Sequence, residues 1–498
     1  MKIKKLLLIA PFASTSIAFV AARCGKGNSA VPEIINTGAS RIEVPADENT
    51  ETNSTSTLES SGSTSESSSA ANTTNSTTTS DDNKQEAPKN NESNSQTSSN
   101  VEERIDNNTY TLNNMNDMPQ RDEPKAKENI METPSISSEE AKKYQKKIEN
   151  IWKKHKYGFA SFHTFDDVLN QLKVYVGEDI AKFLLLADKN KSKDFISKEN
   201  PKKTIELKIG DENFTLKFGD IQSFVPTIYS FKGKENEEHF FSDKNINKLE
   251  VDDSKKIIIK QLGYYKSDNG ESIIMVTVPK NTVKVPDKLP LKINSLFEAF
   301  KGLKTDKVEN LDLWDIKNVT NLTSTFVEAH NFNQSLENWN TINVTNMTST
   351  FSAATKFNGS LKNWKTDNVK SMYSMFAGAE NFNQDINHWN VKKVDDMTDM
   401  FWGAKSFNKP LDKWDVSNVT SMYRMFSEAE SFNQDISKWK VKKVESMYGM
   451  FGGAKSFDQN ISGWELHHNV NHQFFTNESS KLSESNKPAK FKKPASAK

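Results

Sequence analysis

Trp414-Asp415-Val416-Ser417-Asn418-Val419-Thr420-Ser421-Met422 is one copy of a pattern that recurs through the C-terminal part of the chain. Tryptophan returns every 25 residues without one insertion, at Trp314, Trp339, Trp364, Trp389, Trp414, Trp439 and Trp464. Phenylalanine, valine, methionine and alanine keep the same step. A fixed period of roughly 20 to 50 residues predicts a solenoid, in which each coil buries its apolar face against its neighbours.

Two shorter periodicities predict how each coil is built. Apolar and charged residues alternate from Trp439 to Lys442, which indicates one half-buried parallel strand. Apolar residues then step by three and four from Val444 to Ala454, which indicates a short helical segment. Asparagine follows the phenylalanine of most repeats, and we expect it to point inward and to satisfy unpaired backbone groups. These asparagines are Asn333, Asn358, Asn383, Asn408 and Asn433.

The repeat text, as in Phe432-Asn433-Gln434-Asp435-Ile436-Ser437-Lys438-Trp439, resembles the 25-residue repeat of mycoplasma surface lipoproteins, kin to the BspA-type leucine-rich repeat proteins. The resemblance covers residues 285–476 and includes the lead-in Val285-Pro286-Asp287-Lys288-Leu289-Pro290. It implies a leucine-rich-repeat-like solenoid on a membrane-anchored, outward-facing protein. Adhesion or antigenic roles are suspected for that family, and the resemblance implies no enzymatic activity.

The N-terminus predicts export and a lipid anchor. Lysines 2, 4 and 5 precede an apolar run from Leu6 to Ala22, which is the order of a secretory signal peptide. Cys24, the only cysteine, follows directly, and its position resembles the lipidation site of bacterial lipoproteins. Arg23 departs from the small residue that this pattern prefers, so an uncleaved anchor or an ordinary cleaved signal remains the alternative. We therefore expect residues 1–24 to be a lipoprotein signal and the protein to stand on the outer face of the cell membrane.

The segments that flank the repeats differ from one another in composition. Residues 25–136 are dominated by Ser, Thr, Asn and acidic residues, which predicts a disordered tether. Residues 137–284 predict a small α+β domain, with capped helices starting near Ser137 and Thr164. A strand pair within 205–218 and another within 257–278 complete it. Residues 477–498 contain six lysines and predict a disordered basic tail.

Composition excludes several classes of function. Lys plus Arg and Asp plus Glu both number 66, so the net charge is zero and a nucleic-acid partner is not expected. One cysteine excludes an intrachain disulfide framework and a cysteine-based zinc site. His467, His468 and His472 come close in sequence without an acidic or cysteine ligand to complete a metal site. We expect no cofactor, no metal and no catalytic residues, and hence no enzyme.

If the strands alternate as predicted, the residues one before, one after and three after each tryptophan point outward. On three adjacent repeats these positions collect His388, Lys392, Lys413, Lys438, Lys440 and Lys442, with Asp415 as the main interruption. Such a face suits an anionic glycan or an acidic protein, whereas the simpler interpretation is that these lysines keep an exposed sheet soluble. Tyr373, Trp402, Tyr423 and Tyr448 form a second candidate contact surface.

The leading hypothesis is therefore a lipid-anchored surface protein whose solenoid binds a macromolecule of the host or of a neighbouring cell, as in adhesion. The alternative is a non-enzymatic antigenic coat without a specific ligand. A third, weaker hypothesis gives residues 137–284 an enzymatic or secretion-partner role.

Overall fold

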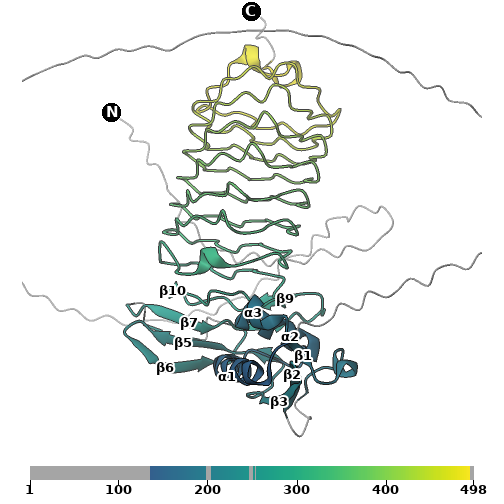
Figure 1. Ribbon diagram of the computed structural model, residues 1–498. Coiled ribbons are helices and arrows are strands. Elements are labelled where there is room, and N and C mark those ends of the chain that lie inside the picture. Colours follow the sequence, from purple (N-terminus) through teal and green to yellow (C-terminus); the bar gives the residue numbers. More distant parts are fainter. Residues whose placement is uncertain (1–134, 198–202, 246–248, 250, 253, 494–498) are drawn as a thin grey trace, which may run out of the picture. The chain divides into compact units, whose positions relative to one another are not determined.

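The structure is a computed structural model that describes residues 135–197, 203–245, 249, 251–252 and 254–493 (Figure 1). The predicted signal peptide, Cys24 and the tether up to residue 134 lie outside these residues. All described residues belong to one of the two compact units of the chain, residues 120–498.

The first described part, up to residue 221, has its own hydrophobic core. Helix α1 (Ser138–His155) is capped by the Ser137 side chain, and α2 (Phe165–Val176) begins with a complete capping box between Thr164 and Asp167. The short α3 (Glu178–Ala181) follows Gly177, whose φ of 86° ends α2. Strands β1 (Leu184–Leu186), β2 (Thr204–Ile209) and β3 (Glu212–Lys217) form an antiparallel sheet against the helices. The predicted helix starts and the first strand pair are thus confirmed.

Among the described residues, seven further strands lie before the repeats. They are β4 (Phe224–Val225), β5 (Thr227–Phe231), β6 (Lys234–Phe241), β7 (Ile257–Gln261), β8 (Tyr264–Lys266), β9 (Ile273–Met275) and β10 (Thr282–Lys284). They make two sheets, with strand orders β10-β7-β5-β6 and β4-β8-β9. The hairpin of β8 and β9 confirms part of the second predicted strand pair. The predicted strand from Ile257 to Tyr265 is divided, and its first half, β7, pairs with β5 and β10 in the other sheet.

No domain boundary follows residue 284, in contrast to the predicted division there. Parallel bridges join Ile274 to Ser295 and Lys284 to Glu309, so β9 and β10 pair with the first coils. Buried residues of β4–β10, such as Tyr264 and Met275, belong to the same hydrophobic core as the repeats. The reason is that a first coil exposes an apolar face that its preceding segment must cover.

Residues 285–476, hereafter the repeat stack, form coils that lie one upon another (Figure 1). Trp339 and Trp364, which are equivalent residues of neighbouring coils, stack with ring centroids 6.3 Å apart and planes 4° apart. Phe351 and Phe376 stack in the same way at 5.7 Å. All of these rings are essentially buried, so the apolar columns that the period predicted form the interior of the stack.

The predicted strand around each tryptophan is wrong, and so is the helical segment after it. The backbone N–H of Trp439 donates to the carbonyl of Ile436 within its own coil, at 3.1 Å. It is therefore not available for a hydrogen bond to a strand of the neighbouring coil. Neighbouring coils instead share one parallel bridge, such as Ser421 with Ser446, and beyond it a series of turns whose alternate amides donate to the next coil, as Phe426 does to Met450 at 3.0 Å. A single 3-10 turn, η3 (Leu311–Leu313), lies in the first coil.

The asparagine ladder forms, although it is not buried. Oδ1 of Asn333 accepts the backbone N–H of Asn358 at 2.8 Å, and the relay continues coil by coil to Asp458. Asn333 is exposed and Asn358 is only half-buried, in contrast to the predicted inward position. The side chains satisfy backbone groups at the edge of the coils rather than in the core.

The predicted disordered tail is also wrong for residues 477–493, hereafter the cap. They contain the 3-10 turns η4 (Glu484–Asn486) and η5 (Ala489–Phe491). Leu482 and Phe491 are buried, and the Ile461 amide of the last coil donates to the Asn486 carbonyl at 3.0 Å. The last coil leaves an apolar face that water would otherwise reach, and the two buried side chains cover it.

Candidate functional site

The six residues of the predicted cationic face lie beside three consecutive tryptophans of the repeat stack. The tryptophans are only 3–4% exposed. Because each one is anchored in the core, the residues next to it are held at the surface of the coil. All six residues are exposed: His388, Lys392, Lys413, Lys438, Lys440 and Lys442. We call this set the lysine face.

Carboxylates on neighbouring coils neutralise part of the lysine face. The Lys442 ammonium lies 3.5 Å from a carboxylate oxygen of Glu465, and both side chains are more than three-quarters exposed. Hydrogen bonds from Ser417 lower the pKa of the Asp415 carboxyl, and the charges of Lys392 and Lys440 lower it further. Exposed pairs of this kind are worth about 0–1 kcal/mol each, because water and salt screen them. The face keeps its net positive charge through Lys413 and Lys438, for which the described residues show no ion pair.

His388 does not add to that charge at neutral pH. Partial burial lowers the pKa of its imidazole below the ordinary value of 6.5, although the nearby carboxylate of Asp385 opposes the shift. The side chain is therefore a neutral hydrogen-bonding group at pH 7. Electrostatic attraction by the face must come from its lysines.

A polar groove of about 450 Å³ crosses several coils at the residues that follow the tryptophans by three to six positions. Asn343 donates to the Lys317 carbonyl at 2.8 Å, and Asn368 donates to the Ile342 carbonyl at the same distance. In the next coil Lys393 replaces the asparagine, and its ammonium donates to Asn368 Oδ1 at 2.8 Å. These residues occupy equivalent positions of successive repeats, so the sequence alone reveals them as a column. Their hydrogen bonds hold adjacent coils together, which leaves few of their polar atoms available to bind a ligand.

The second candidate surface is an aromatic cluster built around Arg424. The guanidinium donates to both carboxylate oxygens of Asp399, each at 2.9 Å, across adjacent coils. It also lies 4.9 Å from the ring centroid of Tyr423 and 5.6 Å from that of Trp402. Tyr423 stacks on Tyr448 at 5.0 Å. We call Asp399, Trp402, Tyr423, Arg424, Tyr448 and Phe474 the aromatic surface.

Burial and charge hold Asp399 and Arg424 together within the aromatic surface. Asp399 is 6% exposed, and this burial raises the pKa of its carboxyl while the Arg424 guanidinium acts in the opposite direction. Phe474 packs edge-on against Tyr448 at 5.3 Å and remains 67% exposed. Tyrosine, tryptophan and arginine are the residues that dominate protein interfaces, because they bury large area with few rotatable bonds. The sequence indicated three of these aromatics, whereas the role of Asp399 and Arg424 depends on coil stacking.

Tyr373, predicted with this surface, is half-buried two coils away from Tyr423 and does not belong to the cluster around Arg424. His467 and His468 lie with ring centroids 4.3 Å apart, whereas His472 stacks on Phe491 of the cap. Among the described residues no group of three or more His, Cys, Asp or Glu could hold a metal ion. The described helices include none that is long and apolar enough to cross a bilayer.

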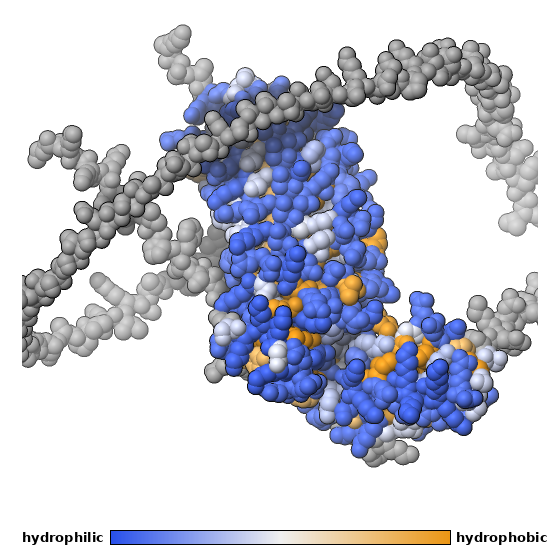
Figure 2. Space-filling view, turned by 60° about the vertical axis from the view of Figure 1, so that its left-hand side comes forward, coloured by the Kyte–Doolittle hydropathy of each residue, from blue (hydrophilic) through white to orange (hydrophobic). Residues whose placement is uncertain are grey.

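One face of the molecule can be surveyed in the space-filling view. Hydrophilic residues cover most of the coils on this face, and hydrophobic residues gather toward the end of the stack nearest the N-terminal part (Figure 2). The exposed large apolar side chains include Leu313 and Ile342, which occupy outward positions beside the first two tryptophans. The lysine face is thus confined to the later coils, and apolar residues occupy some of the equivalent positions in the first coils.

Comparison with known proteins gives one family match. Residues 294–401 and residues 385–488 both match a family model described as a Mycoplasma protein of unknown function, DUF285. The two matches overlap within the repeat stack and extend into the cap. No curated protein and no solved structure matches the chain. The repeats are therefore similar to a mycoplasma protein family.

Proposed function

We propose that this chain is a lipid-anchored protein of the mycoplasma cell surface whose repeat stack, a solenoid of 25-residue coils, binds a macromolecule of the host or of a neighbouring cell. The similarity of residues 294–488 to a mycoplasma protein family supports the proposed mycoplasma origin. The basic and apolar residues before Cys24 support export and anchoring through a lipid on that cysteine. We propose no catalytic role and no cofactor.

The observation that carries the binding proposal is the placement of lysines on rigid, repeated positions. Lys413 and Lys438 occupy the same site in adjacent coils, and Lys440 and Lys442 extend the row on the second coil. An array of fixed cations on an extended surface attracts a polyanionic partner, such as an anionic glycan or an acidic protein. Attraction of this kind weakens with salt, because the Debye length is about 8 Å at physiological ionic strength.

The aromatic surface offers a second route to binding. The exposed ring of Phe474 and the half-buried rings of Trp402, Tyr423 and Tyr448 supply apolar contact area that charge reversal elsewhere would not remove, so binding through this surface would depend little on salt. The two surfaces can therefore be separated by experiment.

The test measures binding of the full chain to host cells and purified matrix components at low and physiological salt. Three variants are compared: Lys413→Glu with Lys438→Glu and Lys440→Glu; Tyr448→Ser with Phe474→Ser; and a control with Lys256→Glu, Lys266→Glu and Lys356→Glu. The control changes the net charge equally at exposed positions outside the lysine face. Loss of saturable, salt-sensitive binding in the first variant alone supports the lysine face.

An equal loss of binding in the first variant and in the control would show that binding depends on the net charge of the protein and not on the lysine face. Loss only in the second variant would move the binding site to the aromatic surface. If the folded wild-type chain binds nothing saturably, the protein is better described as an antigenic coat without a specific ligand.

A further inference from the structure

The residues three and four positions after each tryptophan, hereafter the turn column, project from successive coils. In one coil the Val394 amide donates to the Val391 carbonyl at 2.9 Å, and two coils later the Val444 amide donates to the Val441 carbonyl at 3.0 Å. These valines are at most 1% exposed, so the two residues between each pair stand out from the surface. In these two coils the projecting residues are both lysines: Lys392 with Lys393, and Lys442 with Lys443.

The second lysine of each pair is held in place by the preceding coil. The Lys393 ammonium donates to Asn368 Oδ1 at 2.8 Å, and the Lys443 ammonium donates to Asn418 Oδ1 at 2.7 Å. Each asparagine is fixed in turn, because its side-chain N–H donates to a backbone carbonyl of the coil before it at 2.8 Å. An ammonium group has three donors, so each lysine retains N–H groups for a ligand after this contact.

The positive charges of Lys393 and Lys443 are not cancelled by ion pairs. Their hydrogen-bond partners are neutral amides, and the described residues show no carboxylate within 4.0 Å of either ammonium group. Asp395 and Glu445, which follow the two lysines in sequence by two positions, are exposed and belong to no ion pair of the described residues. A fixed cation without a carboxylate partner attracts an anionic ligand.

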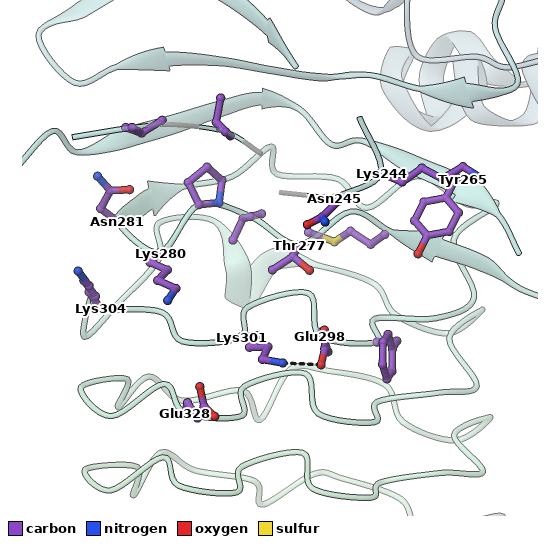
Figure 3. Close-up of a pocket in the computed structure, with 16 residues that line it drawn as sticks. Lys244, Asn245, Tyr265, Thr277, Lys280, Asn281, Glu298, Lys301, Lys304 and Glu328 are labelled. Atoms are coloured by element: carbon purple, nitrogen blue, oxygen red, sulfur yellow. Dashed lines mark hydrogen bonds and ion pairs between the residues drawn. The ribbon is translucent and has the colours of Figure 1, made fainter. Parts of the chain in front are cut away.

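Other lysines of the chain are offset by carboxylates. In the pocket between strands β8–β10 and the first coils, the Lys301 ammonium lies 2.7 Å from a carboxylate oxygen of Glu298 (Figure 3). In the turn column itself, the Lys442 ammonium lies 3.5 Å from a carboxylate oxygen of Glu465. Lys393 and Lys443 are therefore the two positions of the column on which an argument about anions can rest.

Two coils separate these fixed ammonium groups. Parallel bridges join Asp396 to Ser421 and Ser421 to Ser446, so successive coils are about 4.8 Å apart and the two ammonium groups are roughly 10 Å apart. The turn between them, residues 417–418, carries no charge. Because both lysines bind an equivalent asparagine of the preceding coil, the stack sets this spacing rather than the flexibility of the side chains.

We propose that the turn column binds a linear anionic polysaccharide whose charged groups repeat at the spacing of two coils. The inference rests on the proposed function and narrows its partner from a polyanion to this class. One disaccharide of an extended polysaccharide is about as long as two coils, so a chain lying along the column places one anionic group at Lys393 and the next at Lys443. A flexible acidic polypeptide would have to be ordered on binding, which lowers its affinity.

The experiment uses the full chain and two probes of equal total charge, titrated by calorimetry at low salt. One probe is a chondroitin sulfate oligosaccharide, which carries a sulfate on each disaccharide, and the other is poly-L-glutamate. The wild type binds the oligosaccharide saturably and binds poly-L-glutamate more weakly.

The decisive variant exchanges two residues of the turn column, Asn368→Lys with Lys393→Asn. It keeps the net charge, and Asn343 offers the new lysine the same kind of partner, because its side-chain N–H is likewise fixed on the Lys317 carbonyl at 2.8 Å. The distance between the two ammonium groups grows to three coils, roughly 14 Å. The dissociation constant of the oligosaccharide rises about tenfold, because one charge-assisted contact is lost, and that of poly-L-glutamate does not change.

A second variant and a control separate position from charge. Lys393→Asn with Lys443→Asn gives both coils the residue that other coils hold at this position, and it weakens oligosaccharide binding at least as much as the exchange. The control Lys256→Gln with Lys356→Gln removes the same charge at exposed positions outside the column and leaves the constant nearly unchanged. Circular dichroism and the urea midpoint establish that each variant is folded.

An unchanged affinity in the exchange variant would overturn this proposal and leave the proposed function intact, since charge alone would then suffice. Tighter binding of poly-L-glutamate than of the oligosaccharide would also overturn it, in favour of an acidic protein. So would binding of the wild type to host cells without affinity for the oligosaccharide. Absence of binding to cells and to both probes would instead reject the proposed function itself.

Discussion

At the scale of single residues, the tryptophan column contains an internal comparison. Six of the indole N–H groups donate to a backbone carbonyl 28 residues earlier, as Trp414 does to Ile386 at 3.1 Å. The buried indole N–H of Trp389 has no such partner. Both rings are 3% exposed, so the two sites differ mainly in this hydrogen bond.

We expect Trp414→Phe to lower the free energy of unfolding more than Trp389→Phe, by about 1 kcal/mol. Both substitutions remove a similar ring area, but only the first removes a hydrogen bond, after which the Ile386 carbonyl keeps only the backbone N–H of Trp389 at 3.1 Å. Urea unfolding followed by circular dichroism measures the difference. Equal losses in the two variants would show that the indole hydrogen bond contributes nothing net.

A second residue-scale prediction concerns His163 and pH. Burial lowers the pKa of its imidazole from 6.5 to about 4, although the Ala160 backbone and Asp167 oppose the shift. The unfolded chain takes up a proton near pH 6.5 while the folded chain does not, so acidification from pH 6.5 to 4 favours unfolding. The loss attributable to this group approaches about 3 kcal/mol at pH 4.

Urea unfolding at several pH values between 7 and 4 checks this expectation. The free energy of unfolding of His163→Gln should fall less steeply over this interval than that of the wild type, whatever its value at pH 7. Parallel slopes for the two proteins would exclude His163 as a source of the pH dependence.

At the scale of the coil, the strand predicted in each repeat is absent. In its place lies a segment whose successive backbone amides alternate in direction. From Leu322 to Ala329, alternate amides donate to the next coil, as Leu322 does to Asn346 at 2.9 Å, and the others close turns within their own coil. Two positions in most coils have positive φ, as at Ser324 and Glu328. The second of them is held by Glu328, Ala353, Gly378, Gly403, Glu428 and Gly453. Only glycine adopts this conformation without strain.

We therefore expect Gly378→Ala to lower the free energy of unfolding by about 1 kcal/mol, because an L residue is strained at φ of +67°. A Cβ at this site would meet Ala353 at 3.6 Å, an ordinary contact, so strain and not a clash is tested. The reverse change, Ala353→Gly at φ of 56°, should be neutral or stabilising. The urea midpoints of the two variants and of the wild type measure these changes. A Gly378→Ala protein that is more stable than the wild type would contradict the positive φ assigned to this residue.

At the scale of the whole molecule, both ends of the repeat stack are covered by non-repeated residues. Strands β4–β10 cover the first coil, and the cap covers the last. Phe491 is 8% exposed and lies against Phe475 and His472, with ring centroids 4.6 and 4.5 Å away. An uncapped end would expose core side chains and favour association of chains end to end.

Phe491→Ala should lower the free energy of unfolding by about 2–3 kcal/mol, below the usual range for a deeply buried phenylalanine because the site lies at the edge of the core. It should also increase association, measured by light scattering at rising protein concentration. Lys492→Ala, at a neighbouring exposed position, is the control and should change neither quantity. A Phe491→Ala protein with unchanged stability would mean that the cap does not seal the stack.

The sequence by itself determined the apolar columns, the helix caps and the strand pairs, because periodicity and capping depend on the order of residues along one chain. The exposed position of Lys413, Lys438 and Lys440 also followed from the repeat. Only the tertiary structure decided the positive-φ turns, the bidentate pairing of Arg424 with Asp399, and the cap. These arise between residues of adjacent coils, where the next coil's carbonyls, charges and uncovered core set the local conformation, and a one-dimensional pattern does not contain that information.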